Sequence, residues 1–153
     1  MTAKSNLKLV EKHAQILFKH LGIPAEFTVT QDKDTDYLVL QIDTESTGLI
    51  IGYRGETLSA VQQILSHQLK KETNEWQKLI VNVGGYREQR EQTLLQIAQN
   101  AAKKVEFSGE PYIFTNLTPP ERRIVHMALQ DNPKITTESQ GEGKHRQLVV
   151  KAK

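Results

Sequence analysis

Residues 48–58 read Gly48-Leu-Ile-Ile-Gly-Tyr-Arg-Gly-Glu-Thr-Leu58, and this stretch decides the fold. Its glycines, Gly52 and Gly55, enclose Tyr53 and Arg54 between an apolar run and an amphipathic segment. Apolar residues recur every three or four positions in that segment, which predicts a helix: Leu58, Val61, Ile64, Leu65 and Leu69. Because glycine has no Cβ atom, the backbone can come close to a ligand at this loop.

The segments around the loop predict a small α+β domain that fills residues 1–84. A helical stripe ends at Gly22 and Pro24; its members are Leu7, Val10, Ala14, Leu17 and Leu21. Residues 27–31 and 37–42 alternate apolar and polar side chains across the polar turn 32–36, which is typical of a β-hairpin. Residues 79–83 predict a third strand, which ends at Gly84-Gly85. The order is therefore α-β-β-α-β.

The remaining residues, 85–153, predict a second α+β domain with the order α-β-α-β-β. Its first helix carries an apolar stripe of Leu94, Ile97, Ala98, Ala101 and Val105. Residues 112–114 follow as a short strand. Thr118, Pro119 and Glu121 form a strong helix start, because threonine caps, proline fits the first position and glutamate reaches back to the cap amide. That helix runs to about Leu129, and residues 135–139 and 147–151 predict a final hairpin.

Composition narrows the classes of protein. The absence of cysteine excludes disulfides, thiolate metal sites and a cysteine nucleophile, and is compatible with the cytoplasm. No apolar run reaches the roughly 20 residues of a membrane span, and the N-terminus predicts no signal peptide. No nucleophile–base arrangement, metal-ligand spacing or nucleotide motif stands out. We therefore expect no catalytic residues, no metal and no cofactor.

Charge is divided unevenly along the chain. Residues 1–84 hold nine basic and ten acidic side chains, whereas residues 85–153 hold eleven and eight. The weakly basic second half suits a phosphate-bearing partner.

The loop Gly52-Tyr53-Arg54-Gly55 predicts a phosphate contact. Amides of the loop and of the helix start can point at phosphates, assisted by the helix dipole, and Arg54 adds a positive charge. A KH domain holds about four nucleotides of single strand in this way. The alternative interpretation is a tight turn that only joins two elements. A dinucleotide or Walker A site does not fit, because the third glycine and the Gly-Lys-Ser/Thr triplet are missing.

A second candidate site lies on the helix capped by Thr118. Arg122 and His126 are four residues apart, so they share one helix face, and Arg123 neighbours His126 at the i+3 spacing. A guanidinium one turn from an imidazole can hold a phosphate. Lys144 and Arg146 in the final hairpin extend this predicted surface. The alternative is a solvated helix face with an incidental histidine.

Four separated motifs resemble one bacterial family. They are residues 49–58, Gly85-Tyr86-Arg87 with Arg90, Pro120–His126, and Ser139–Gly143. The chain is similar to the KH plus R-3-H (Arg-x-x-x-His) proteins known as the Jag, KhpB or SpoIIIJ-associated family. The resemblance implies a type II KH domain followed by an R-3-H domain that together bind single-stranded RNA without catalysis. It also implies post-transcriptional regulation, a link to cell elongation and division, and a small KH-only protein as partner. Arg87 and Arg90 become possible auxiliary RNA contacts.

The chain departs from the family pattern in two respects. Many relatives carry an extra N-terminal domain and linker, which we expect to be lacking here. The loop of relatives usually has two basic residues, but the first is Tyr53 in this chain. Tyr53 can stack on a base instead, while the missing charge makes salt dependence shallower. Binding of single-stranded DNA, and a scaffold role with a protein partner or self-association, remain alternative functions.

Overall fold

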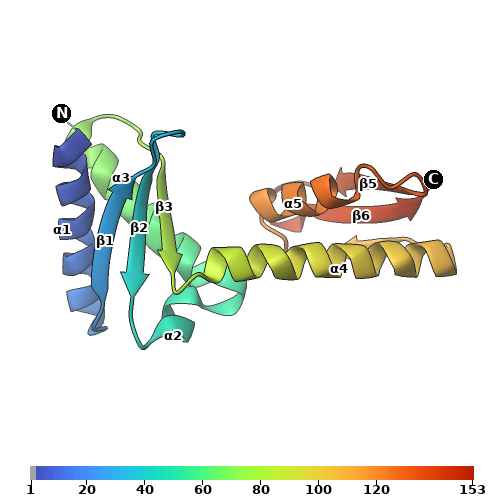
Figure 1. The fold of residues 1–153 in the computed structure, drawn as a ribbon, viewed down its shortest axis with the longest axis horizontal. Helices are drawn as coiled ribbons and strands as arrows, with labels where there is room; N and C mark the ends of the chain where they lie inside the picture. Colours follow the sequence, from blue (N-terminus) through green and yellow to red (C-terminus); the bar gives the residue numbers. More distant parts are fainter. Residues whose placement is uncertain (1–2) are drawn as a thin grey trace. The chain divides into compact units, whose positions relative to one another are not determined.

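The computed structural model describes residues 3–153, apart from the side chains of Ala3, Lys4 and Lys144. The chain forms two compact units, Met1–Arg87 and Glu88–Lys153. Each unit combines helices with a three-stranded sheet, which confirms the predicted α+β class (Figure 1). The boundary predicted after Gly84 stays a prediction for where the chain divides into separate domains.

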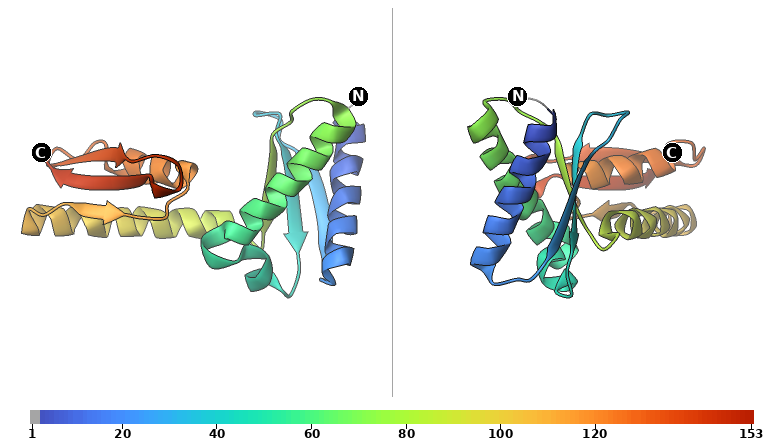
Figure 2. Two further views of the ribbon diagram at one scale, coloured as in Figure 1. Left: turned by 180° about the vertical axis from the view of Figure 1, so that it is seen from behind. Right: turned by 60° about the vertical axis from the view of Figure 1, so that its left-hand side comes forward.

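The first unit is a sheet with two long helices on one face (Figure 1; Figure 2, right). Its elements are α1 (Ala3–Leu21), β1 (Glu26–Gln31), β2 (Leu38–Asp43), α2 (Thr47–Ile51), α3 (Glu56–Thr73) and β3 (Leu79–Val83). Strand β2 lies in the centre, antiparallel to β1 and parallel to β3. The parallel pair requires a crossover, which α2, the glycine loop and α3 supply. The short helix α2 stands where the sequence predicted no element.

Alternation along β2 and β3 builds the core of this unit. Register places three buried pairs side by side: Leu38 with Leu79, Leu40 with Val81, and Ile42 with Val83. Helix α3 buries Leu58, Val61, Leu65 and Leu69 against them, as predicted. The predicted stripe is wrong at Ile64, which is 44% exposed.

The stripe predicted for α1 is wrong at its C-terminal end. Phe18 is 1% exposed and lies edge-on to Phe27, with ring centroids 5.1 Å apart, whereas Leu21 is 52% exposed. Val10, Ala14 and Phe18 follow an i, i+4, i+8 pattern, which a straight helix keeps on one face. Leu21 is the last residue before the left-handed Gly22, where the chain leaves the helix.

The second unit contains α4 (Tyr86–Ser108), β4 (Tyr112–Phe114), α5 (Pro119–Leu129), β5 (Ile135–Gln140) and β6 (Gln147–Ala152). Helix α4 begins at Tyr86, in the last residues of the first unit, and continues into the second unit from Glu88. Strand β6 is central and antiparallel to both β4 and β5. Three alanines of α4, Ala98, Ala101 and Ala102, are buried in a core shared with Val125 of α5 and Leu148 of β6. Such small side chains let a helix approach its neighbours closely.

None of the helices within residues 3–153 is long and apolar enough to cross a membrane.

Candidate nucleic-acid interface

The glycine loop is a left-handed turn between α2 and α3. Gly52 ends α2 at φ 68° and ψ −169°, and Gly55 precedes α3 at φ 84° and ψ 12°. Arg54 between them also has a positive φ, 49°. Three of four consecutive residues therefore occupy a region that side chains disfavour. This geometry reverses the chain sharply just before the N-terminus of α3.

A neighbouring side chain occupies the space where each glycine would carry a Cβ atom. A Cβ atom on Gly52 would lie 2.0 Å from Oγ1 and 2.7 Å from Cβ of Thr57. On Gly55 it would lie 3.0 Å from the Cε1 and hydroxyl oxygen atoms of Tyr86. Gly52 is thus required by both its φ angle and a hard contact, while Gly55 makes room for the aromatic ring at the start of α4.

The two side chains between the glycines point into solvent and lie against each other. Tyr53 is 64% exposed, and the Arg54 guanidinium carbon is 5.0 Å from the centroid of its ring. A cation over an aromatic face at this distance is attracted by the ring. The loop therefore presents one charge together with one flat aromatic surface.

The apolar residues beside the loop belong to the core. Ile50 and Leu58 are 1% and 2% exposed, and Ile51 packs against the same cluster. Their burial assigns these side chains to core packing.

Arg87 forms hydrogen bonds to the edge of strand β3 that is unpaired within residues 3–153. Its Nε donates to the carbonyl oxygen of Val81 at 2.8 Å, and its Nη2 donates to Oε1 of Gln62 at 2.6 Å. The same Gln62 oxygen accepts the Val81 amide at 3.1 Å. Two side chains thus satisfy the backbone at an edge that, within the described residues, pairs with a strand on one side only.

The second candidate site is a concave pocket of about 370 Å³ between α5 and β5. Its lining residues are Pro119, Arg122, Arg123, His126, Thr137, Ser139 and Arg146. Four of the five second-domain residues predicted from the sequence therefore meet in one place. The side chain of the fifth, Lys144, lies outside the described residues. Three arginines, a histidine and two hydroxyl-bearing residues line the pocket, which is a donor set suited to an anion.

Sequence reasoning missed Thr137 and Ser139 as members of this pocket. They are two positions apart on β5, so they share the face that α5 packs on. Glu138 between them lies on the opposite face, where Lys151 Nζ donates to its carboxylate at 2.8 Å. Hydrogen bonds from Lys151 and Gln140 lower the pKa of Glu138. The negative charge is thus held away from the pocket.

Hydrogen bonds orient the predicted Arg and His pair. Arg122 Nη1 donates to the carbonyl oxygens of Leu117 at 2.6 Å and Arg146 at 3.4 Å. His126 Nδ1 is 2.5 Å from Oγ1 of Thr137. The remaining guanidinium donors and the second imidazole nitrogen are the groups that can meet a phosphate.

Arg90 pairs with a carboxylate in the first turn of α5, the helix that carries Arg122 and His126. Its Nε lies 2.8 Å from Oε1 of Glu121, and the two side chains are 18% and 11% exposed. The other carboxylate oxygen of Glu121 accepts the Thr118 amide at 2.8 Å, which completes the predicted cap of α5. The auxiliary candidates Arg87 and Arg90 thus both form hydrogen bonds within the protein, although Arg87 is exposed.

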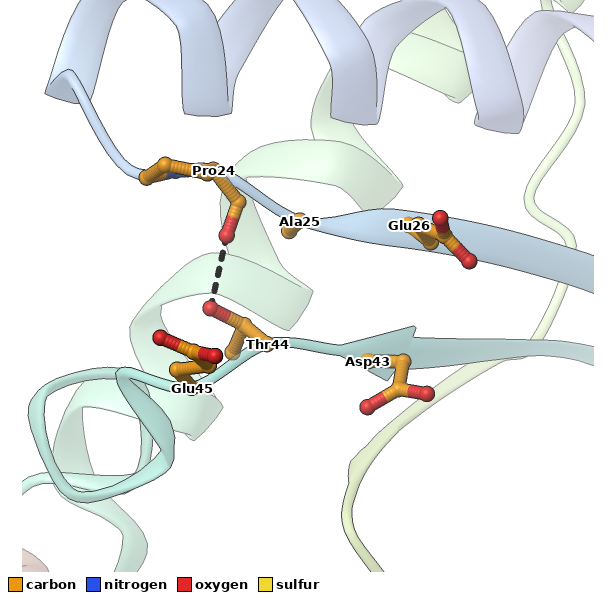
Figure 3. Close-up of a pocket in the computed structure, with 6 residues that line it drawn as sticks. All are labelled: Pro24, Ala25, Glu26, Asp43, Thr44 and Glu45. Carbon is orange, nitrogen blue, oxygen red and sulfur yellow. Dashed lines mark hydrogen bonds between the residues drawn. The ribbon is translucent and has the colours of Figure 1, made fainter.

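A third hollow lies where β1 begins and β2 ends (Figure 3). The Thr44 hydroxyl donates to the Pro24 carbonyl at 2.7 Å and ties the two segments together. Three carboxylates line this hollow, those of Glu26, Asp43 and Glu45. Their charge is unfavourable for a phosphate. Among the described residues, no group of three or more histidines and carboxylates is arranged to hold a metal ion.

The fold and the two sites define a class of protein: a type II KH domain followed by an R-3-H domain. Comparison with known families agrees, since the KhpA/KhpB KH domain matches residues 8–83 and the R-3-H domain matches residues 92–152.

The particular family follows from three relatives, each called RNA-binding protein KhpB. The one from Bacillus subtilis is 30% identical, over 96% of this chain and 75% of the relative. That from Clostridium symbiosum is 28% identical, over 99% and 69%. That from Lactiplantibacillus plantarum is 32% identical, over 85% of this chain but only 42% of the relative. The chain belongs to the KhpB family.

Exchange of the loop glycine should test the backbone geometry. We expect Gly52→Ala to lower the free energy of unfolding by about 1–3 kcal/mol, because φ 68° is strained for alanine and Thr57 blocks its Cβ. Gly48→Ala is the matched control, since Gly48 lies in α2 with open space around it. Alanine there should raise stability by up to about 1 kcal/mol. Urea denaturation measures both, and equal effects would contradict the proposed strain.

Removal of the Glu121 carboxylate should destabilise the second unit. We expect Glu121→Ala to cost about 1–3 kcal/mol, because it leaves the Arg90 guanidinium and the Thr118 amide without their partner. Glu91→Ala, an exposed change on α4, should stay within about 0.5 kcal/mol of the parent. Thermal unfolding monitored by circular dichroism distinguishes the two, and a Glu121 variant as stable as the control would refute the supporting role.

Proposed function

We propose that this protein binds single-stranded RNA through two sites on one chain and performs no catalysis. The relatives' names support RNA as the ligand, although this chain spans less than half of one of them. The pocket lined by Arg122, Arg123, His126 and Arg146 is the observation that carries the proposal. Such a set of donors has no partner of opposite charge among its own lining residues, so an external anion is its natural complement.

In this proposal the RNA backbone passes over the glycine loop. The exposed Tyr53 and Arg54 mark the side of the loop that is open to a ligand, and the amides at the N-terminus of α3 favour negative charge. Arg54 neutralises a phosphate, while the exposed ring of Tyr53 offers a surface for one base.

The second pocket holds a further phosphate of the same strand. Two weak sites on one chain raise the effective concentration of each for a shared ligand. Since Tyr53 replaces a basic residue in the loop, affinity depends more on the second pocket than in a doubly basic relative. The cytoplasm, a small KH-only partner or self-association, and a role in regulation linked to cell elongation and division belong to the same proposal.

The loop is tested by reversal of its charge. Gly52→Asp with Arg54→Asp should abolish most RNA binding, because two carboxylates then face the phosphates. The matched control is Gly109→Asp with Lys12→Asp, which changes a left-handed glycine and an exposed lysine outside both sites. Filter binding at moderate salt is the measurement. Unchanged affinity in a folded loop variant would refute the loop as a clamp, and competition with a matched DNA strand tells RNA from DNA binding.

The second pocket is tested by strand length. Arg122→Ala with His126→Ala should weaken binding of a long oligonucleotide more than that of a four-nucleotide one, because only the long strand reaches both sites. The control pair, Lys134→Ala with His20→Ala, removes an exposed cation and an exposed histidine outside the pocket. Equal losses for both lengths in the pocket variant would contradict two cooperating sites.

A further inference from the structure

Trp76, the sole tryptophan of the chain, is an exposed aromatic residue that neither site uses. It lies in the connection between α3 and β3, and its side chain is 59% exposed. This connection leaves α3 at the end opposite α2 and the glycine loop (Figure 1). The 18 residues of α3 separate the two features by about 27 Å.

Neighbouring side chains hold the indole in place. Lys70 Nζ is 4.4 Å from the centroid of the indole ring, and the His67 ring meets it edge-on at 5.2 Å with an interplanar angle of 70°. The connection itself is tied down, because the Asn6 amide donates to the Gln77 side chain at 3.0 Å and the Thr73 hydroxyl donates to the Glu75 carbonyl at 3.1 Å. The indole is therefore presented in a defined position while much of its surface meets water.

The charges around the indole favour an anionic ligand with a flat face. Lys70 contacts the indole ring, and Lys71 and Lys78 lie within five residues of Trp76 in the sequence. Lys78 also donates to the Tyr37 hydroxyl at 2.8 Å. Two carboxylates, Glu72 and Glu75, lie in the same stretch of sequence, and Glu72 is 2.8 Å from His13 Nε2. An aromatic surface beside lysines is the combination that binds single-stranded nucleic acid by base stacking and phosphate contact.

We propose that Trp76 is a stacking site for one nucleotide of an RNA strand whose other end is held at the glycine loop, with Lys70 beside its phosphate. The inference rests on the proposed RNA-binding function and extends it to the far end of α3. A four-nucleotide strand fills the loop site alone, whereas a strand of about 15 nucleotides extends beyond it.

The single tryptophan makes the test direct. An unstructured 15-nucleotide RNA should quench the Trp76 emission of the full chain, and a four-nucleotide RNA bound at saturation should not. Trp76→Ala should weaken binding of the 15-nucleotide RNA roughly five- to 100-fold and leave the four-nucleotide affinity unchanged. Trp76→Phe, which keeps an aromatic face, should recover most of the loss. Phe107→Ala is the matched control, because Phe107 is an aromatic residue that is 96% exposed in the second unit.

The outcomes separate this inference from the function on which it rests. If neither RNA binds the parent chain, the proposed function fails and the stacking site fails with it. If both RNAs bind and depend on the loop, but emission is constant and Trp76→Ala binds as the parent does, the stacking site alone is overturned. Emission that changes with protein concentration before RNA is added would place the indole in a protein contact and also overturn the proposal.

Discussion

The contact between Gly52 and Thr57 is the constraint on which the first unit depends. A Cβ atom at position 52 would lie 2.0 Å from the Thr57 hydroxyl oxygen, so no side chain fits there. With glycine at this position, the chain can reverse within four residues. That reversal lets Ile50 enter the core from α2 while Leu58 enters it from α3. The same loop presents the exposed side chains of Tyr53 and Arg54, which the proposed function places against RNA.

In the second unit, side-chain contacts and not a glycine turn hold the helix of the candidate site in place. A buried carboxylate, Glu121, caps α5 and pairs with Arg90, so the helix that carries Arg122 and His126 is fixed at its first turn. Fixing the helix before a ligand arrives reduces the entropy lost on binding. The charged Arg122 is also anchored, through the Leu117 carbonyl, so part of its freedom has already been lost.

Local rules explain what the sequence could predict. The cap at Thr118, the strand 79–83 and the hairpin alternation depend on neighbours in the chain, and the structure contains each of them. Helix α2 was missed because Gly48 and two isoleucines have low helix propensity, and only burial of Ile50 makes them helical. Thr137 joined the pocket through strand pairing, and the bond from Arg90 to Glu121 spans 31 residues. Such contacts depend on packing that periodicity does not contain.

The charge of the glycine loop has a consequence for how the two units share a strand. A loop with Tyr53 in place of a cation releases fewer counterions on binding, so its contribution falls less steeply with salt. The pocket gathers three guanidinium groups, and its contribution falls more steeply. In the proposed binding mode, the pocket would dominate encounter with the strand at low salt, whereas stacking on the exposed Tyr53 ring would persist as salt rises. Under the proposed function, the tyrosine would thus change which kind of interaction holds the strand, because a screened charge gives way to an aromatic surface that ions do not screen.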